Sequence, residues 1–270
     1  IRVDVIDGGA VWMDGGSIFG VVPKPLWSQV RHVDAENRVR LSFFSLLVRT
    51  GKATVVIEGG AAAHYPPKVR EHFNADESQL VSTLALLGVD PGKVDFFIPS
   101  HLHFDHVGGA STADGKALVF PRAEHVFQRR EWDEARNPCP INRNAYVPGD
   151  IEPLESARLF LVDKEAEITP GVSVSKTGGH SYGHQKIRVG RKGGPALAFV
   201  GDLIPTSEHV SPRWMCAFDI DPAATYDAKM EIFAEAADNG TFVAAGHGGH
   251  MPLFTVTRAD KGRYVAEKAP

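Results

Sequence analysis

The chain has 270 residues, 43% of them apolar, and carries 29 Lys and Arg against 33 Asp and Glu, which gives a formal net charge of −4. This composition is typical of a folded chain with a sizeable core, and it excludes disordered and collagen-like proteins. The mildly acidic balance argues against a nucleic-acid partner, since nucleic-acid-binding proteins normally present a basic face. No stretch approaches the roughly 20 apolar residues that a membrane span requires, so no membrane partner is expected either.

The two cysteines cannot form a disulfide framework, so the chain does not need an oxidising compartment. We therefore expect a cytoplasmic protein. Because the sequence begins at Ile1 rather than at a methionine, removal of a leader, and with it a secreted or periplasmic location, stays an alternative.

Short apolar strands alternate with amphipathic helices, which indicates an α/β fold, and no linker divides residues 1–270 into separate domains. Residues 1–39 are expected to form an N-terminal extension or lid. Within them, residues 15–27 are apolar but interrupted by Gly and Pro, a pattern too irregular for a helix or a full strand. Strands are predicted at 40–48 and 54–57, and a helix is predicted to begin at Asp76 with Gln79 as its capping-box partner. Further strands are predicted at 94–98, 116–120, 125–128, 172–176, 186–189, 196–200 and 241–245, and further helices at 225–237 and, as a solvated helix, at 129–136.

Four side chains that can bind metals occur within six residues in His101-Leu-His-Phe-Asp-His106. His101 and His103 alternate, so both can point to one side of an extended loop, whereas Asp105 and His106 must project differently and can serve a second metal. Imidazole nitrogens with a carboxylate suit zinc and tolerate iron or manganese. Packing alone seldom explains such a density, because burying several imidazoles without partners costs free energy.

Three later motifs follow predicted strands. His180 lies in Thr177-Gly-Gly-His-Ser-Tyr-Gly-His184, Asp202 lies in Phe199-Val-Gly-Asp-Leu203, and His247 follows Gly246. Together with His-x-His-x-Asp-His and the Gly-Gly that comes after it, these motifs resemble the signature of the metallo-β-lactamase superfamily, over roughly residues 40–250. The resemblance implies a four-layer αββα sandwich with a metal groove at its edge.

The resemblance also implies two divalent metal ions, with zinc preferred and iron, manganese or cobalt as alternatives. It assigns His101, His103 and His180 to the first metal, Asp105, His106 and His247 to the second, and Asp202 to a bridging position between them. The implied reaction is hydrolysis of a lactone or carboxylic ester by a hydroxide that bridges the metals. Asp105 is the expected catalytic residue, and either Asp105 or a metal-bound water is expected to protonate the leaving alkoxide.

A bridging carboxylate separates this chain from true β-lactamases, whose corresponding ligand is usually a cysteine, and Cys216 lies too far along the chain to take that place. The ligand set is similar to those of lactonases, glyoxalase II and phosphotriesterase-like members. Phosphotriester or phosphodiester hydrolysis is therefore the first alternative. A glyoxalase II-like thioesterase and an iron-dependent redox enzyme of the same fold are weaker ones. Residues 15–27 and Phe104 resemble the branch that contains quorum-quenching lactonases and methyl-parathion-type hydrolases.

The expected partner is a small molecule with an apolar portion. Its predicted contacts are Phe19, Val21, Trp27, Phe104, Tyr182 and His209. Pro205 stands where acyl-homoserine lactonases commonly have a tyrosine that donates to the substrate, so either Tyr182 or His209 takes over this role or the substrate differs. A homodimer is a further expectation.

Other polar residues near the motifs are expected to support the ligands. Glu58 stands where the family usually has aspartate, and it is expected to hydrogen-bond the ligand loop. His184 is expected to be a packed or backbone-bonded turn residue, and His250 either a supporting or a surface group.

Overall fold

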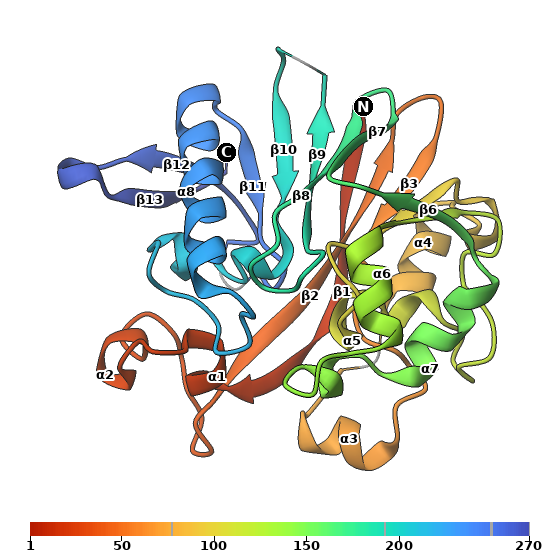
Figure 1. Ribbon diagram of the computed structural model, residues 1–270, viewed down its shortest axis with the longest axis horizontal. Coiled ribbons are helices and arrows are strands. Elements are labelled where there is room, and N and C mark those ends of the chain that lie inside the picture. Colours follow the sequence, from red (N-terminus) through yellow and green to blue (C-terminus); the bar gives the residue numbers. More distant parts are fainter. Residues whose placement is uncertain (77, 192, 249–250, 270) are drawn as a thin grey trace.

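The computed structural model describes residues 1–76, 78–191, 193–248 and 251–269. Two β-sheets pack face to face at its centre, and helices cover the outer face of each sheet (Figure 1). This arrangement confirms the predicted α/β sandwich with its four layers.

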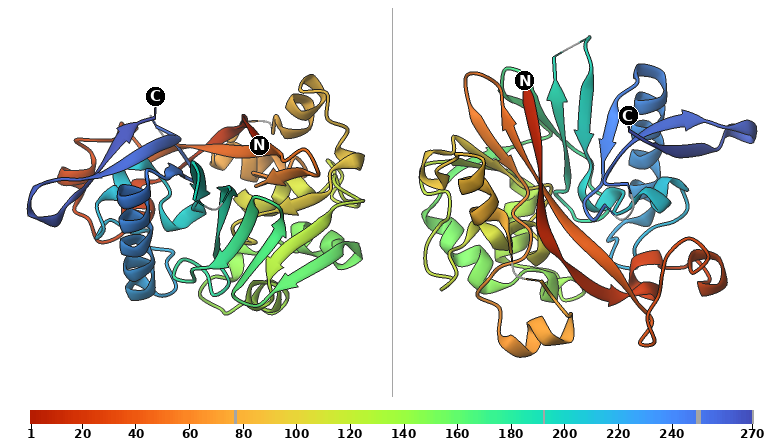
Figure 2. Two further views of the ribbon diagram at one scale, coloured as in Figure 1. Left: turned by 90° about the horizontal axis from the view of Figure 1, so that it is seen from above. Right: turned by 180° about the vertical axis from the view of Figure 1, so that it is seen from behind.

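The first sheet has the strand order β1-β2-β3-β4-β5-β6, and the second has the order β13-β12-β11-β10-β9-β8-β7. The strands of the first sheet are β1 (Arg2–Asp14), β2 (Arg38–Arg49), β3 (Thr54–Ile57), β4 (Phe96–Ile98), β5 (Glu124–Gln128) and β6 (Arg158–Val162). Those of the second are β7 (Glu165–Thr169), β8 (Val172–Lys176), β9 (Gln185–Gly190), β10 (Ala196–Phe199), β11 (Phe242–Ala244), β12 (Leu253–Arg258) and β13 (Tyr264–Lys268). The β12–β13 hairpin extends away from the rest of its sheet (Figure 2).

The α-helices are α1 (Gly15–Phe19), α2 (Lys24–Trp27), α3 (Pro67–His72), α4 (Leu80–Leu86), α5 (Phe104–Val107), α6 (Arg129–Arg136), α7 (Pro148–Ile151) and α8 (Pro222–Asn239). Among the described residues, no helix combines the length and apolar character needed to cross a membrane. Strands β3 to β6 run parallel to one another, and β10 runs parallel to β11. The carboxyl ends of the parallel strands within each sheet therefore meet at one edge, which is where the polar loops lie.

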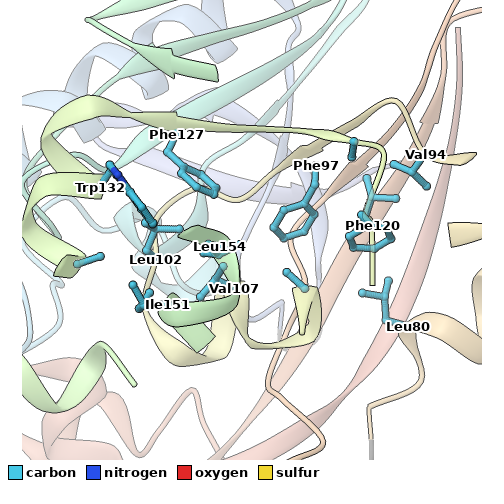
Figure 3. Close-up of a cluster of buried hydrophobic side chains, with 14 of the residues drawn as sticks. Leu80, Val94, Phe97, Leu102, Val107, Phe120, Phe127, Trp132, Ile151 and Leu154 are labelled. Atoms are coloured by element: carbon cyan, nitrogen blue, oxygen red, sulfur yellow. The ribbon is translucent and has the colours of Figure 1, made fainter. Parts of the chain in front are cut away.

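The alternation of side chains along the central strands builds the layers. Ile98 of β4 and Val126 of β5 face the second sheet, whereas the adjacent Phe97 and Phe127 face the helices. Phe97, Phe127 and Trp132 of α6 form part of the buried cluster between the first sheet and its helices (Figure 3). These positions are at most 6% exposed, so each strand contributes to two cores at once.

The N-terminal segment contains a strand that its sequence pattern does not reveal. β1 pairs antiparallel with β2 from Arg2 to Asp14, with a shift in register between Asp7 and Ala10. Gly9, with φ of 95°, lies in this irregular stretch and interrupts the apolar pattern of the strand. The prediction that residues 15–27 are too irregular for a helix is wrong, because two short helices, α1 and α2, lie within them. The first part of the expected extension is thus integral to the first sheet.

Two other element predictions are wrong. The helix expected from Asp76 begins at Leu80, because the Asp76 backbone N–H instead donates to the Ala10 carbonyl of β1. No strand forms at 116–120, where the chain makes a turn closed by an isolated bridge between Ser111 and Leu118. Phe120 is fully buried in the core beneath the helices, so its apolar neighbourhood reflects packing rather than sheet pairing.

The helix predicted at 129–136 forms as α6, but the prediction that it is a solvated surface helix is wrong. Glu131, Trp132, Glu134 and Ala135 are buried on its inner side. Its sequence misleads because two of its inward-facing residues are acidic, and charged residues are rarely buried without partners. Glu131 has such partners in the loops that carry the candidate metal ligands.

Candidate metal centre

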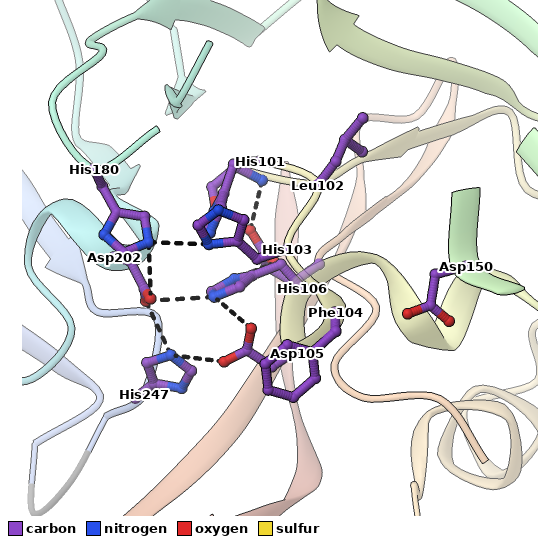
Figure 4. A network of polar contacts seen from close by, with 12 residues as sticks. His101, Leu102, His103, Phe104, Asp105, His106, Asp150, His180, Asp202 and His247 are labelled. Carbon is purple, nitrogen blue, oxygen red and sulfur yellow. Dashed lines mark hydrogen bonds and ion pairs between the residues drawn. The ribbon is translucent and has the colours of Figure 1, made fainter. Parts of the chain in front are cut away.

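The predicted ligands come together from separate loops at one edge of the sandwich (Figure 4). They follow β4 (His101, His103, Asp105 and His106), β8 (His180), β10 (Asp202) and β11 (His247). All seven residues are at most 9% exposed. Residues up to about 150 positions apart in the chain therefore share one buried polar cluster.

The loop after β4 is aimed by its apolar residues. Leu102, between His101 and His103, is fully buried in the core under the helices, and so is Val107 at the end of α5. Because neighbouring residues of an extended segment point to opposite sides, burying Leu102 turns both flanking imidazoles toward the cluster. The Leu102 N–H also donates to Glu131 Oε1 over 3.0 Å.

The ligand atoms form two groups, in each of which they lie within 4.8 Å of one another. One group is His101, His103 and His180, and the other is Asp105, His106, Asp202 and His247. Asp202 faces both groups. Its Oδ2 lies 3.5 Å from Nε2 of His180, and its Oδ1 lies 2.9 Å from Nε2 of His247. One oxygen toward each group is the arrangement that a bridging carboxylate requires.

The donor set fits two divalent cations. The Nε2 atom of buried His101 has no hydrogen-bond partner among the described residues, and Nδ1 of His103 faces Nε2 of His180 at 3.2 Å. Burial, with the charges of neighbouring imidazoles, holds the pKa of His101 and of His103 well below the usual range. Neutral imidazoles with free lone pairs are the form that binds metal. A cation in this place would satisfy nitrogens that otherwise cost free energy.

The second group contains two carboxylates, those of Asp105 and Asp202, and a third, that of Glu58, lies beside His106. Burial opposes the charged form of His106, but the carboxylates of Asp202, Glu58 and Asp105 outweigh it and raise the pKa of His106 well above its usual value. Burial likewise opposes ionisation of Asp202, yet His247 and His106 hold the pKa of its carboxyl well below the ordinary one. The carboxylates of this group therefore stabilise a positive charge placed among them. A bound metal ion would supply that charge.

Glu58 supports the ligand loop as predicted. Its Oε1 accepts from the Ser100 N–H over 2.6 Å, and its Oε2 accepts from Nδ1 of His106 over 2.8 Å. The longer side chain is accommodated by a left-handed backbone, since Glu58 has φ of 66°. The carboxylate fixes the His106 ring so that Nε2 points toward Asp202, 3.4 Å away.

Replacing Glu58 by alanine is expected to weaken metal binding and activity by about 10- to 100-fold, because outer hydrogen-bond partners of ligands have effects of that size. Glu58→Gln should lose less, since its amide oxygen can still accept from His106. Metal content after dialysis against a weak chelator, together with kcat/KM, measures both effects. Equal losses in the two variants would show that the charge of Glu58 matters more than its hydrogen bond to the ring.

His180 has a corresponding partner in Asp219, which the sequence pattern does not reveal. Nδ1 of His180 donates to Asp219 Oδ1 over 2.8 Å, and the Asp219 side chain is 1% exposed. Asp219 follows none of the motifs, and its only signal is its position on the loop that leads from Asp202 to α8. This bond leaves Nε2 of His180 free to face Asp202.

We expect Asp219→Ala to lower kcat/KM about 10- to 100-fold through loss of the first metal, and Asp219→Asn to retain most of the activity because its carbonyl oxygen still accepts from His180. Metal stoichiometry and steady-state kinetics on both variants test this. The idea fails if Asp219→Ala keeps wild-type metal content and rate.

Two glycines of the motifs are required by close approach. A Cβ atom on Gly109 would lie 2.1 Å from the Gly59 carbonyl oxygen, and one on Gly201 would lie 2.3 Å from Ser100 Oγ. Gly201 also has φ of 48°, in the left-handed region. The glycines after the histidine cluster and before Asp202 thus let the ligand loops pack against neighbouring backbone.

The six predicted substrate contacts are not brought to one place. Phe19 and Trp27 are 1% exposed and stack at 5.1 Å in a core under α1 and α2. His209 is fully buried against Phe19, where its Nε2 donates to the Ile18 carbonyl. Val21, in contrast, is 89% exposed.

The other two predicted contacts lie on the ligand segments. Phe104 is half-buried next to Asp105, and its ring packs against those of Tyr65 and Phe73 at 6.0 and 6.4 Å. Tyr182 is half-buried with the Arg130 guanidinium 4.4 Å from its ring centre.

The remaining residues singled out in the sequence have structural contacts. The Pro205 carbonyl accepts from the His247 N–H over 2.7 Å, so this residue positions His247 through its backbone. His184 is a buried turn residue as predicted, with Nδ1 2.6 Å from Thr177 Oγ1. His250 lies outside the described residues.

Comparison with known proteins agrees with this geometry. Residues 41–249 match the metallo-beta-lactamase superfamily. The chain is 28% identical to the N-acyl homoserine lactonase AttM of Azorhizobium caulinodans over 229 residues, which are 79% of this chain and 83% of that protein. A probable metal-dependent hydrolase from Staphylococcus aureus has a similar structure, with a TM-score of 0.89 and 28% identity over 100% of this chain and 98% of that one. AidC, a dizinc quorum-quenching lactonase, shares the fold at a TM-score of 0.82 and 18% identity over 99% and 94% of the two chains.

The sandwich and the two groups of His and Asp side chains define a metal-dependent hydrolase with places for two divalent ions. The chain belongs to the metallo-beta-lactamase superfamily.

Proposed function

We propose that the protein is a dinuclear zinc hydrolase that opens a lactone, or cleaves a related carboxylic ester, with an apolar portion. The observation that carries this proposal is Asp202, which directs one oxygen to each of two His-containing ligand groups. The similarity to an N-acyl homoserine lactonase over most of both chains supports a lactone rather than another ester as the substrate.

In the proposed site, each metal has its own set of side chains. His101, His103 and His180 would hold the first ion, Asp105, His106 and His247 the second, and Asp202 both. Two divalent ions held there would supply a hydroxide nucleophile at neutral pH and would polarise the carbonyl oxygen of the ester.

Asp105 is the residue that we assign to proton transfer. Its Oδ2 lies 3.5 Å from Nε2 of His247, and its Oδ1 lies 3.7 Å from Nε2 of His106. A carboxylate in this position can take a proton from the nucleophile and deliver it to the leaving alkoxide, which splits one difficult transfer into two short ones. Deep burial of the cluster keeps bulk water away from these groups and strengthens their electrostatic effects.

The apolar portion of the substrate would lie against half-buried aromatic side chains beside Asp105. Phe104 and Phe73 stack there with an interplanar angle of 30°, and pockets for small molecules are commonly lined in this way. Phe19, Trp27 and His209 would support this wall from the core rather than touch the substrate.

Phosphotriester hydrolysis is the second candidate, and Pro205 is the observation that favours it. Pro205 has no donor to offer to the leaving oxygen of a lactone, and its carbonyl already binds His247. A substrate whose leaving group needs no donor there, such as an aryl phosphotriester, would lose nothing by this substitution.

One preparation tests both candidates. Metal content is measured by mass spectrometry, and kcat/KM is measured for N-acyl homoserine lactones, simple lactones, aryl esters and phosphotriesters. We expect about two equivalents of zinc per chain and the highest kcat/KM with a lactone. Phosphotriester rates far above all lactone rates would replace the proposed substrate, and iron with redox turnover but no hydrolysis would overturn the proposed class.

A further inference from the structure

The loop after β3 lies along the short helix that carries Asp105 and His106. The Gly59 N–H donates to the His106 carbonyl over 2.7 Å, and the Gly60 carbonyl accepts from the Gly109 N–H over 3.1 Å. Farther along this loop, Tyr65 Oη lies 3.0 Å from the Phe104 carbonyl, at the first residue of α5. A helix of one turn is unstable by itself, so its orientation depends on such outside contacts.

Tyr65 has a second oxygen partner. Its Oη lies 2.5 Å from Oδ2 of Asp150, which belongs to α7 and is 0% exposed. A tyrosine hydroxyl carries one proton and can donate only one hydrogen bond, while a backbone carbonyl can only accept. Both contacts are satisfied together only when Tyr65 donates to the Phe104 carbonyl and Asp150 carries a proton that it donates to Tyr65.

The surroundings of Asp150 favour this protonated form. Burial raises the pKa of Asp150 to about 7; the nearby charge of Asp105 adds to this shift, and the Tyr65 hydroxyl opposes it. Nε2 of His64 lies 3.2 Å from the other oxygen, Oδ1, and burial lowers the pKa of His64, although the Asp114 charge and the Thr112 backbone oppose this shift. Oδ1 accepts no hydrogen bond from the described residues, so no donor on that side stabilises an ionised carboxylate, whereas a proton on Oδ2 removes its charge.

We propose that Asp150, Tyr65 and the Phe104 carbonyl form a directed hydrogen-bond chain that positions Asp105 and His106 for the second metal. Tyr65 and Asp150 are thus positioning residues that act through the backbone of α5 and touch neither metal nor substrate. This inference rests on the proposed function, in which Asp105 and His106 hold that ion. It also gives loop 137–147 and α7 a role, since they bring Asp150 to the back of the ligand helix.

Three substitutions and one control test the chain. Tyr65→Phe removes the hydroxyl, and Asp150→Ala removes its donor. Asp150→Asn keeps a neutral group of the same shape, whose amide N–H can donate to Tyr65 while its oxygen takes the place of Oδ1. Tyr264→Phe is the matched control, because it removes another buried tyrosine hydroxyl, which in β13 bonds to Arg258 over 3.0 Å. The readouts are zinc titration of the metal-stripped protein against a chromophoric chelator, melting temperature, and kcat and KM with the best lactone.

We expect Tyr65→Phe and Asp150→Ala to weaken binding of the second zinc equivalent about 10-fold, at the lower end of the range for groups behind metal ligands. Binding of the first equivalent should not change, and kcat should fall in parallel while KM stays within about twofold. Asp150→Asn should restore both the second equivalent and kcat to within about threefold of wild type. Tyr264→Phe should lower only the melting temperature.

Two results would overturn the inference. Unchanged second-zinc affinity in Tyr65→Phe would show that the hydroxyl does not position the site. A loss in Asp150→Asn as large as in Asp150→Ala would show that the carboxylate charge, and not a donated proton, is required. If Asp150→Ala does not fold, Tyr65→Phe and Asp150→Asn decide alone. A wild-type protein that binds fewer than two equivalents would instead refute the proposed function, which this titration detects separately.

Discussion

Asp202→Ala is expected to lower kcat/KM by about 10³-fold or more and to reduce bound metal from two equivalents per chain to about one. The charge stabilisation that a metal supplies in the transition state amounts to several kcal/mol, and each 1.36 kcal/mol corresponds to a factor of ten in rate. Asp202 directs one oxygen to His180 and the other to His247 and His106. Its loss therefore affects both groups, unlike the loss of any single histidine.

The measurement is metal content and kcat/KM on the same purified variant, with Asp163→Ala as a control, because Asp163 is an exposed aspartate paired with Arg129 on the surface. Asp202→Asn sharpens the result. Its amide keeps one oxygen ligand but loses the negative charge and the second ligand oxygen, so we expect near-complete loss of activity with part of the metal retained. Two full equivalents of metal and near-wild-type activity in Asp202→Ala would show that Asp202 does not join the two sites.

The sequence indicates well which His and Asp side chains come together in the two groups, because most of the information is local. His101, His103, Asp105 and His106 are adjacent, and each later ligand stands in a short motif directly after a predicted strand. The same motifs contain the tight Gly-Gly and Gly-Asp turns. Glycine is required in them because a Cβ atom would collide with neighbouring backbone or side chains. Glu58 could be predicted for a similar reason, because it ends a strand beside the ligand loop.

Residues that act through distant partners could not be found in the same way. Asp219 lies 39 positions after His180 and Asp150 lies 85 positions after Tyr65, and neither pair has a fixed spacing that a single sequence displays. Aromatic residues present the opposite difficulty. Phe19 and Trp27 have the apolar character expected of a substrate wall, but the same character suits the core in which the structure places them. Hydrophobicity alone does not distinguish these environments.

Glu131 shows how the ligand loops are joined beneath the site. Its Oε1 accepts from the Leu102 N–H over 3.0 Å and from Tyr146 Oη over 3.1 Å. Its Oε2 accepts from Ser181 Oγ over 2.7 Å and from the Gly183 N–H over 2.9 Å. A single carboxylate, 1% exposed, thus connects the loop of His101 and His103 to the loop of His180, so the three ligands of the first group share one support.

Glu131→Ala should therefore destabilise the protein by about 3–5 kcal/mol, because it leaves four buried donors without an acceptor. For a chain of this size we expect the melting temperature to fall by about 10 °C or more, and the first metal to bind more weakly than the second. Glu134→Ala is the matched control on the same helix. Glu134 is also buried, but within the described part of the chain its side chain accepts a backbone hydrogen bond only from the Cys139 N–H and pairs with Arg130. Its loss should therefore cost about 1–2 kcal/mol and leave metal affinity unchanged. Equal destabilisation by the two variants would mean that burial of a carboxylate in α6, rather than the connection between the ligand loops, determines the effect.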